Sequence, residues 1–257
     1  MLAALALPGS AQRMPTVELR PEARQAFERH VKQREAGILS QRIGGGKFLW
    51  ADEASDRRDR VKSGEIVVAP GFDRGMIEVK GGMVNDWIGA AFLTGTTLAK
   101  VLATIQNYDS HKRFYQPEVA DSRLLEHSGN NYKVRFRLLK KKIITVVFNT
   151  DHDIIYLPLD ATHQYSKSHT TRVAEIAYPG EAGGRELTPG DDHGLLWNLN
   201  TFWRFLQRDG GVWVECEAIT LTRGIPMGLG WLITPIIREL PRESLTQTLE
   251  GTRRAIR

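Results

Sequence analysis

The sequence predicts an α+β fold in which a curved antiparallel sheet wraps around a long C-terminal helix, with a helical extension at the N-terminus. Three observations carry this prediction. Strand-like segments follow one another through the second half of the chain, and short polar or glycine-containing links join them. Such links connect antiparallel neighbours, because a parallel pair needs a crossover of a dozen or more residues. Helical patterns precede and follow the strands, as in folds that place helices on one face of an antiparallel sheet.

The first segment, residues 1–11, carries no charge and ends in small residues. It resembles the end of a signal peptide, with Ala11 as the last residue before cleavage. The basic start of a signal peptide is missing from this segment, so a frayed apolar N-terminus is the alternative. We expect a periplasmic or secreted protein if residues 1–11 are a signal-peptide remnant, and a cytoplasmic protein otherwise.

Residues 12–62 are predicted to form a charged helical arm or linker. An apolar stripe that includes Ala23, Phe27 and Val31 predicts a helix over residues 16–36, with Thr16 as its cap and Gly37 at its end. The arm contains 12 basic and 8 acidic residues in mixed order, a pattern typical of a solvated helix. We therefore expect an extension without a core of its own.

Residues 63–257 are predicted to form the main, ligand-binding domain. Short strands are expected over residues 66–68, 76–79 and 83–93, before a helix that Thr96 or Thr97 caps. The triplet Asp151-His152-Asp153 is predicted to be a turn, because Asp favours local backbone hydrogen bonds. Further strands are expected over residues 122–126, 132–139, 143–149, 154–159, 168–177, 195–206 and 212–222.

The chain closes with two helical segments. Residues 228–237 are mostly apolar and contain Pro235, but a membrane span needs about 20 such residues, so no integral membrane segment is expected. Pro241 then begins a second run in which Leu245 and Leu249 share one face. A strongly curved sheet wrapped on this helix leaves a space, and concave apolar spaces commonly bind small molecules.

Composition excludes several classes of protein. Hydrophobic residues make up 41% of the 257 residues, enough for a packed core, and the net charge of +5 lies mainly in the arm. Without a concentrated basic face, a nucleic-acid partner is not expected. The single cysteine, Cys216, excludes an intramolecular disulfide and a multi-cysteine metal site. The histidines lack metal-binding spacing, and Gly44-Gly45-Gly46-Lys47 lacks the pattern of a phosphate loop, so we expect neither metal nor cofactor.

Two stretches of the sequence carry a resemblance to a known family. They comprise Asp86-Trp87-Ile88-Gly89, the predicted helix 97–108, residues 115–119 with 122–124, residues 196–205, residues 210–217 with 223–226, Gly230-Trp231 and residues 241–245. Over roughly residues 75–257 the chain resembles the START-like superfamily, which has the helix-grip fold of Bet v 1 and of bacterial polyketide cyclase-like and lipid-transport proteins. The resemblance implies a ligand cavity under the C-terminal helix. It transfers no catalytic residue, because the superfamily contains carriers, receptors, cyclases and hydroxylase domains.

The hairpin over residues 195–222 is the most informative segment. A two-residue loop at Asp209-Gly210 or at Gly210-Gly211 places Arg204 opposite Glu215 or Glu217. The opposite face of the hairpin is almost purely apolar, which directs it toward the core. The face that carries Arg204 also displays aromatic and aliphatic side chains. Either the arm covers this face, or the face lines the cavity and Arg204 orients a polar end of the ligand.

Aromatic side chains on the predicted inner faces complete the candidate site, because they suit a planar or lipid-like ligand. Trp231 and residues 228–240 are expected to form a gate at Pro235. The residues predicted to bind the ligand are Trp87, Tyr115, Tyr132, Phe136, Phe148, Tyr156, Trp203, Phe205, Trp231, Arg204, Glu215 and Glu217.

Three functions are compatible with these features. The first is non-catalytic binding and carriage of a hydrophobic small molecule or lipid. The second is an enzyme of the cyclase/aromatase or hydrolase kind on the same fold, which needs a titratable group in the cavity; its candidates are Glu215, Glu217, Tyr156 and His169. The third is a structural or interaction protein with a collapsed cavity, smaller than about 300 Å³. An apolar hairpin face turned inward favours carriage, and an inward Arg/Glu face favours chemistry or polar recognition.

Overall fold

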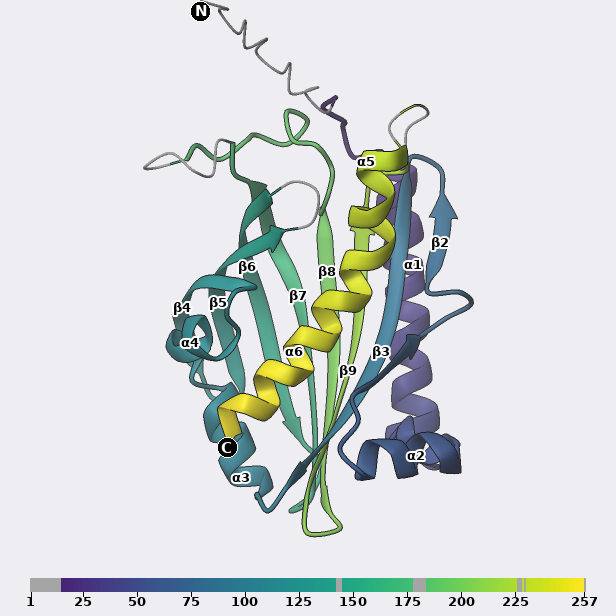
Figure 1. Cartoon of the computed structure of the whole chain (residues 1–257), viewed down its shortest axis with the longest axis vertical. Helices are drawn as coiled ribbons and strands as arrows, with labels where there is room; N and C mark the ends of the chain where they lie inside the picture. The colour runs from purple at the N-terminus through teal and green to yellow at the C-terminus, as the bar shows by residue number, and fades with distance from the viewer. Residues whose placement is uncertain (1–14, 142–144, 178–183, 226–227, 229, 257) are drawn as a thin grey trace, which may run out of the picture.

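A computed structural model describes residues 15–141, 145–177, 184–225, 228 and 230–256. Nine strands of this part of the chain form one antiparallel sheet in the order β1-β3-β9-β8-β7-β6-β5-β4, with β2 also paired to β3 (Figure 1). The predicted α+β class and antiparallel pairing are therefore confirmed. The strands are β1 (Val67–Pro70), β2 (Met76–Val79), β3 (Gly82–Thr94), β4 (Val119–Ser128), β5 (Asn131–Lys141), β6 (Thr145–Pro158), β7 (His163–Glu175), β8 (Asn198–Arg208) and β9 (Gly211–Thr222).

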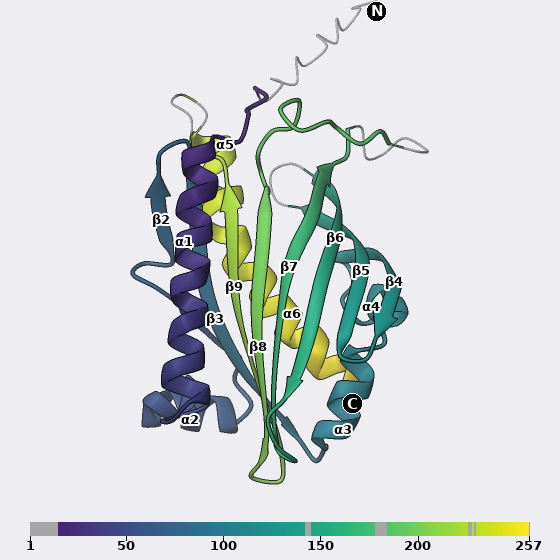
Figure 2. The same ribbon diagram turned by 180° about the vertical axis from the view of Figure 1, so that it is seen from behind.

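Helices lie on both faces of the sheet. The C-terminal helix α6 crosses the concave face diagonally, and the N-terminal helix α1 runs along the opposite, outer face (Figures 1 and 2). The helices are α1 (Pro21–Gly37), α2 (Ser55–Lys62), α3 (Leu98–Ile105), α4 (His111–Phe114), α5 (Gly230–Thr234) and α6 (Leu240–Ile256). Short 3-10 segments span Ala51–Glu53 and Tyr108–Ser110, and π-helical segments span Ile38–Ile43 and Pro235–Glu239.

The turn between β8 and β9 fixes the register of the central hairpin. Asp209 and Gly210 both have positive φ, 60° and 75°, as a two-residue type I′ turn requires. This turn places Arg204 opposite Glu215, which is the first of the two registers predicted from the sequence.

The concave face of the sheet forms the main core with α6 and α3. Leu245 and Leu249 of α6 are buried against it, together with Val101 of α3. Close approach of α6 depends on Gly251, because a Cβ atom there would lie 2.6 Å from Cδ1 of Tyr115. At this point α6 packs against the residue that follows α4, and the cavity described below lies between α6 and the concave face of the sheet.

The outer face of the sheet is covered by the arm. Ala23, Phe27 and Val31 of α1 pack on buried side chains of the sheet such as Phe202. Helix α1 begins at Pro21 rather than at residue 16, because proline is accommodated in the first helical turn and its fixed φ suits that position. The predicted remnant over residues 1–11 lies outside the described residues.

One predicted turn is wrong. Asp151-His152-Asp153 lies inside β6, which pairs without a break with β5 and with a register shift at Asp151/His152 with β7. The buried side chain of His152 and the pairing on both sides override the local turn preference of aspartate. The two strands expected over residues 143–149 and 154–159 are thus one.

No helix among the described residues is long and apolar enough to cross a membrane.

Candidate functional site

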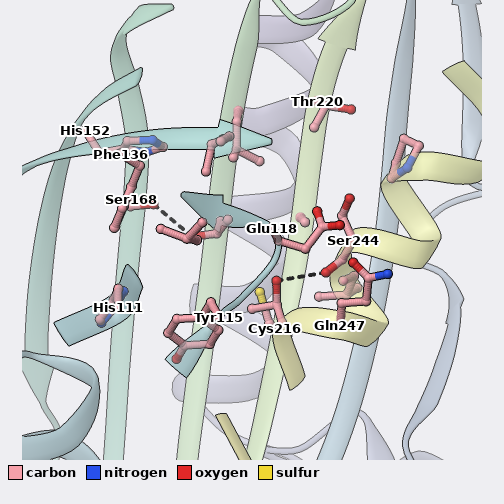
Figure 3. A pocket seen from close by; sticks show the side chains of 18 of the residues that line it. His111, Tyr115, Glu118, Phe136, His152, Ser168, Cys216, Thr220, Ser244 and Gln247 are labelled. Atoms are coloured by element: carbon pink, nitrogen blue, oxygen red, sulfur yellow. Dashed lines mark hydrogen bonds between the residues drawn. The ribbon is translucent and has the colours of Figure 1, made fainter. Parts of the chain in front are cut away.

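A cavity of about 450 Å³ lies between the concave face of the sheet and α6. Side chains from β5 to β9, from α4 and from α6 line it, and Figure 3 shows several of them converging on this space. The volume falls in the range of about 300–1,000 Å³ that is usual for small-molecule sites.

Strand periodicity gives the cavity an apolar wall. Alternate residues of β8, among them Leu199, Trp203 and Phe205, point into it, and so do Cys216 and Ala218 of β9. The rings of Trp203 and Phe205 stack with centroids 5.8 Å apart. The almost purely apolar face of the hairpin therefore faces the cavity.

Paired hydroxyl groups interrupt the apolar wall without leaving charge in it. The hydroxyls of Tyr108 and Tyr156 lie 2.8 Å apart, and Ser168 Oγ lies 2.8 Å from Thr201 Oγ1 (Figure 3 shows Ser168). Burial raises the pKa of Tyr156 above its ordinary value, so its hydroxyl stays protonated at neutral pH. These groups can orient a ligand through hydrogen bonds, but they supply no base.

Two histidines of the cavity wall are held neutral. Burial lowers the pKa of His111 and of His152 to about 4, because an apolar surrounding disfavours the charged imidazolium. His111 Nε2 lies 2.7 Å from the carbonyl oxygen of Ile105, and His152 Nε2 lies 2.9 Å from Thr150 Oγ1. Each ring therefore keeps a polar partner in its neutral form.

One cluster of polar and charged groups lies where β5, the segment before β4 and α6 meet. Lys140 forms an ion pair with Glu118 and donates a hydrogen bond from Nζ to Ser244 Oγ at 2.9 Å. Glu118 and Ser244 point toward each other in Figure 3. Burial lowers the pKa of Lys140 to about 7.

Half of the residues predicted to bind a ligand line this cavity. They are Tyr115, Phe136, Phe148, Tyr156, Trp203 and Phe205. All six are aromatic residues on predicted inner faces, which is the signal that located them.

The three charged residues of that set lie on the other side of the sheet. Arg204, Glu215 and Glu217 are fully buried under the arm, where Glu215 accepts hydrogen bonds from the backbone N–H groups of Trp50 and Ala51. The prediction that the face with Arg204 lines the cavity is therefore wrong. The arm covers this face, as the alternative prediction states. The charged face points outward because the apolar face of the same hairpin is turned toward α6.

Arg34 of α1 joins the same buried cluster. Its Nε donates to Glu217 Oε1 at 2.7 Å, and His30 Nε2 lies 2.7 Å from Asp86 Oδ2. Burial and then the nearby carboxylate of Asp86 raise the pKa of Glu217. These contacts fasten the arm to the sheet.

Three aromatic residues of the predicted set also do not line the cavity. Trp87 packs at the edge of the core, where the Arg242 guanidinium lies 6.0 Å from its ring. Tyr132 stacks on His127 and lines a second, more polar pocket of about 420 Å³. Trp231 is 65% exposed, because it lies on the short helix α5 beyond the sheet. The gate around Pro235 stays a prediction.

Sequence reasoning missed the polar groups of the cavity. Lys140 belongs to a lysine run that is typical of a hairpin tip, and Glu118 and Ser244 are 22 and 104 residues away from it. His152 lies in a triplet whose local pattern predicts a turn. Among the described residues there is no group of three or more His, Cys, Asp or Glu side chains placed to hold a metal ion.

Comparison of structures finds known proteins that are similar to this chain, whereas comparison of sequences finds none. No protein-family model matches the sequence, and no curated protein matches it. A STAR-related lipid transfer protein fragment from Xanthomonas axonopodis is 15% identical, with a TM-score of 0.48 over 71% of this chain and 98% of that chain. The Thermus thermophilus protein TTHA0849 is 13% identical, with a TM-score of 0.47 over 66% of this chain and 94% of that chain.

A further solved structure is the Zhui aromatase/cyclase from Streptomyces sp. R1128, which is 12% identical, with a TM-score of 0.39 over 67% of this chain and 91% of that chain. The fold follows from this chain's own topology. Strands and a helix are succeeded by a series of antiparallel strands and by a terminal helix that crosses the concave face of the sheet. The chain therefore has a helix-grip fold, in which an antiparallel sheet curves around the C-terminal helix.

Proposed function

We propose that the protein binds a hydrophobic small molecule or a lipid in the cavity between the sheet and α6 and carries it without catalysis. The observation that carries this proposal is the direction of the central hairpin, whose apolar face lines the cavity. Its charged face is buried under the arm. Apolar walls supply affinity by removing ligand surface from water, at about 25 cal/mol per Å².

The volume of the cavity supports binding over a collapsed interior. About 450 Å³ lies between the walls, whereas a structural or interaction protein is expected to leave less than about 300 Å³. The hydroxyl pairs Tyr108–Tyr156 and Ser168–Thr201 offer hydrogen bonds to a polar end of the ligand.

Positions of the titratable groups favour carriage over a cyclase/aromatase or hydrolase reaction. Of the four candidates for an acid or base, Glu215 and Glu217 lie on the outer face, and His169 is exposed. Only Tyr156 lines the cavity, and its raised pKa makes it a poor base.

Straight-chain alcohols test this proposal by calorimetry. Each added methylene that enters an apolar cavity contributes about 0.8 kcal/mol, so affinity is expected to rise roughly fourfold per carbon until the chain outgrows the space. Native mass spectrometry of the purified protein should show a co-purifying apolar molecule. Alcohols that bind without dependence on chain length, or do not bind, would contradict the proposal.

A further inference from the structure

The ion pair Lys140–Glu118 lies in a cavity whose walls are mainly apolar, and carriage of an apolar ligand does not require it. Lys140 comes from the end of β5, Glu118 from the residue before β4, and Ser244 from α6. All three line the cavity. Lys140 and Glu118 keep 18% and 15% of their side chains exposed, so both side chains remain accessible to water.

The surroundings of the amine make it unusual for a lysine. Leu138, Phe148 and Leu240 line the same space, and enclosure lowers the pKa of Lys140 to about 7. Glu250 and Arg254 of α6 also line the cavity. A lysine that is partly deprotonated at neutral pH is a nucleophile, whereas an ammonium group is not.

The charges of Lys140 and Glu118 determine which polar group of a ligand can bind beside them. A carboxylate ligand would approach Lys140 beside the carboxylate of Glu118, and like charges at close range repel. A neutral end avoids this repulsion. A carbonyl group is neutral, accepts hydrogen bonds and reacts with amines.

We propose that Lys140 captures an apolar aldehyde or ketone as a reversible imine, with Glu118 as the proton carrier and Ser244 positioning the amine. This inference rests on the proposed function, because the apolar part of the ligand would occupy the cavity. It names the class of ligand that the cavity holds and a covalent bond that retains it.

The reaction needs no reagent other than the ligand. Glu118 takes the proton of the Lys140 ammonium, and the free Nζ lone pair attacks the carbonyl carbon. The C–N bond forms, the carbonyl π pair moves to oxygen, and a proton passes from nitrogen to that oxygen to give a carbinolamine. Glu118 then returns its proton to the hydroxyl group, water leaves, and the iminium remains paired with the Glu118 carboxylate. Hydrolysis reverses each step and releases the ligand.

Reductive trapping tests the proposal on the full chain. Decanal and sodium cyanoborohydride at pH 7 convert an imine into a stable secondary amine, and peptide mapping locates it. We expect Lys140 to be labelled at least about tenfold faster than its exposed neighbour Lys141, because the cavity raises the local concentration of the aldehyde. Lys141→Arg should leave labelling of Lys140 unchanged, and Lys140→Arg should abolish the fast phase.

Competition with 1-decanol keeps the test independent of whether a variant folds. The alcohol fills the cavity but forms no imine, so saturating 1-decanol should slow labelling of Lys140 and leave Lys141 unaffected. Labelling of Lys140 that is no faster than that of Lys141, or that 1-decanol does not slow, would overturn the proposal. If calorimetry shows that 1-decanol binds while Lys140 is not preferentially labelled, the imine is refuted and carriage stands. If 1-decanol does not bind, both proposals fail.

Discussion

Arg204 on β8 and Glu215 on β9 face each other across the central hairpin, with Arg204 Nε 3.1 Å from Glu215 Oε2, and neither side chain is exposed. Both carboxylate oxygens of Glu215 also accept backbone hydrogen bonds, from Trp50 and Ala51 of the arm. A single carboxylate thus joins the sheet to the segment that covers it. This pair stabilises the outer layer of the protein and has no contact with the cavity.

Breaking this pair from one side should be costly. In Arg204→Met the buried Glu215 carboxylate loses its cation, and we expect the free energy of unfolding to fall by about 3–5 kcal/mol in urea denaturation. The exposed pair Arg135–Asp151, with atoms 2.7 Å apart, is the control, and Arg135→Met should cost less than about 1 kcal/mol. Equal losses in the two variants would refute the role given to Arg204.

Two glycines in helices should respond to alanine in opposite directions. Gly251 of α6 has no room for a Cβ atom, which would lie 2.6 Å from Tyr115 Cδ1, so Gly251→Ala should lower stability by about 1–3 kcal/mol. At Gly37 of α1 nothing lies within 4 Å of that position, so Gly37→Ala should raise stability by about 0.5–1 kcal/mol. Thermal unfolding measures both. A stabilised Gly251→Ala variant would mean that α6 does not approach Tyr115 this closely.

Acid should destabilise the protein in part through His152. The unfolded state takes up a proton near pH 6.5, but the folded state, with a pKa of about 4 at His152, does so only in stronger acid. The unfolded state therefore binds more protons between these values, and stability falls as pH falls. From pH 7 to pH 5, His152→Gln should lose about 2 kcal/mol less than the wild type in urea denaturation. Identical losses would contradict burial of a neutral His152.

Filling the cavity should remove binding while leaving the fold intact. Ala218 of β9 lines the space, and in Ala218→Phe the new ring occupies the volume that an alcohol chain would use. We expect the affinity for 1-decanol to fall by about tenfold or more in calorimetry. The matched control is Leu125→Phe on β4, a position that is 45% exposed, and its affinity should equal that of the wild type. Unchanged binding by Ala218→Phe would place the alcohol elsewhere.

Period-2 patterning predicted the two faces of the β8–β9 hairpin but could not by itself choose which one faces the cavity. Phe202 and Ile219 make the charged face apolar as well, because the arm covers it and both faces of the sheet are therefore buried. Five of the six predicted aromatic residues found in the cavity lie on strands, and the alternation of side chains along a strand made them accessible to sequence reasoning.

The polar groups of the cavity depend on tertiary contacts that no local pattern contains. Lys140 resembles its neighbour Lys141 in sequence, and its place in the cavity with its contacts to Glu118 and Ser244 distinguishes it. His152 likewise lies between two aspartates that favour a turn, yet pairing with β5 and β7 keeps the strand continuous. Trp231 shows the opposite error, because an aromatic residue in an apolar segment is exposed there.

A crystal structure under xenon pressure tests the central claim, an open apolar space between the sheet and α6, most directly. Apolar cavities in proteins stay dry and bind xenon. We expect xenon atoms against Trp203, Phe205 and Cys216, in the cavity of about 450 Å³. A crystal in which xenon is absent from this place, with side chains filling the interior between β8, β9 and α6, would contradict the account.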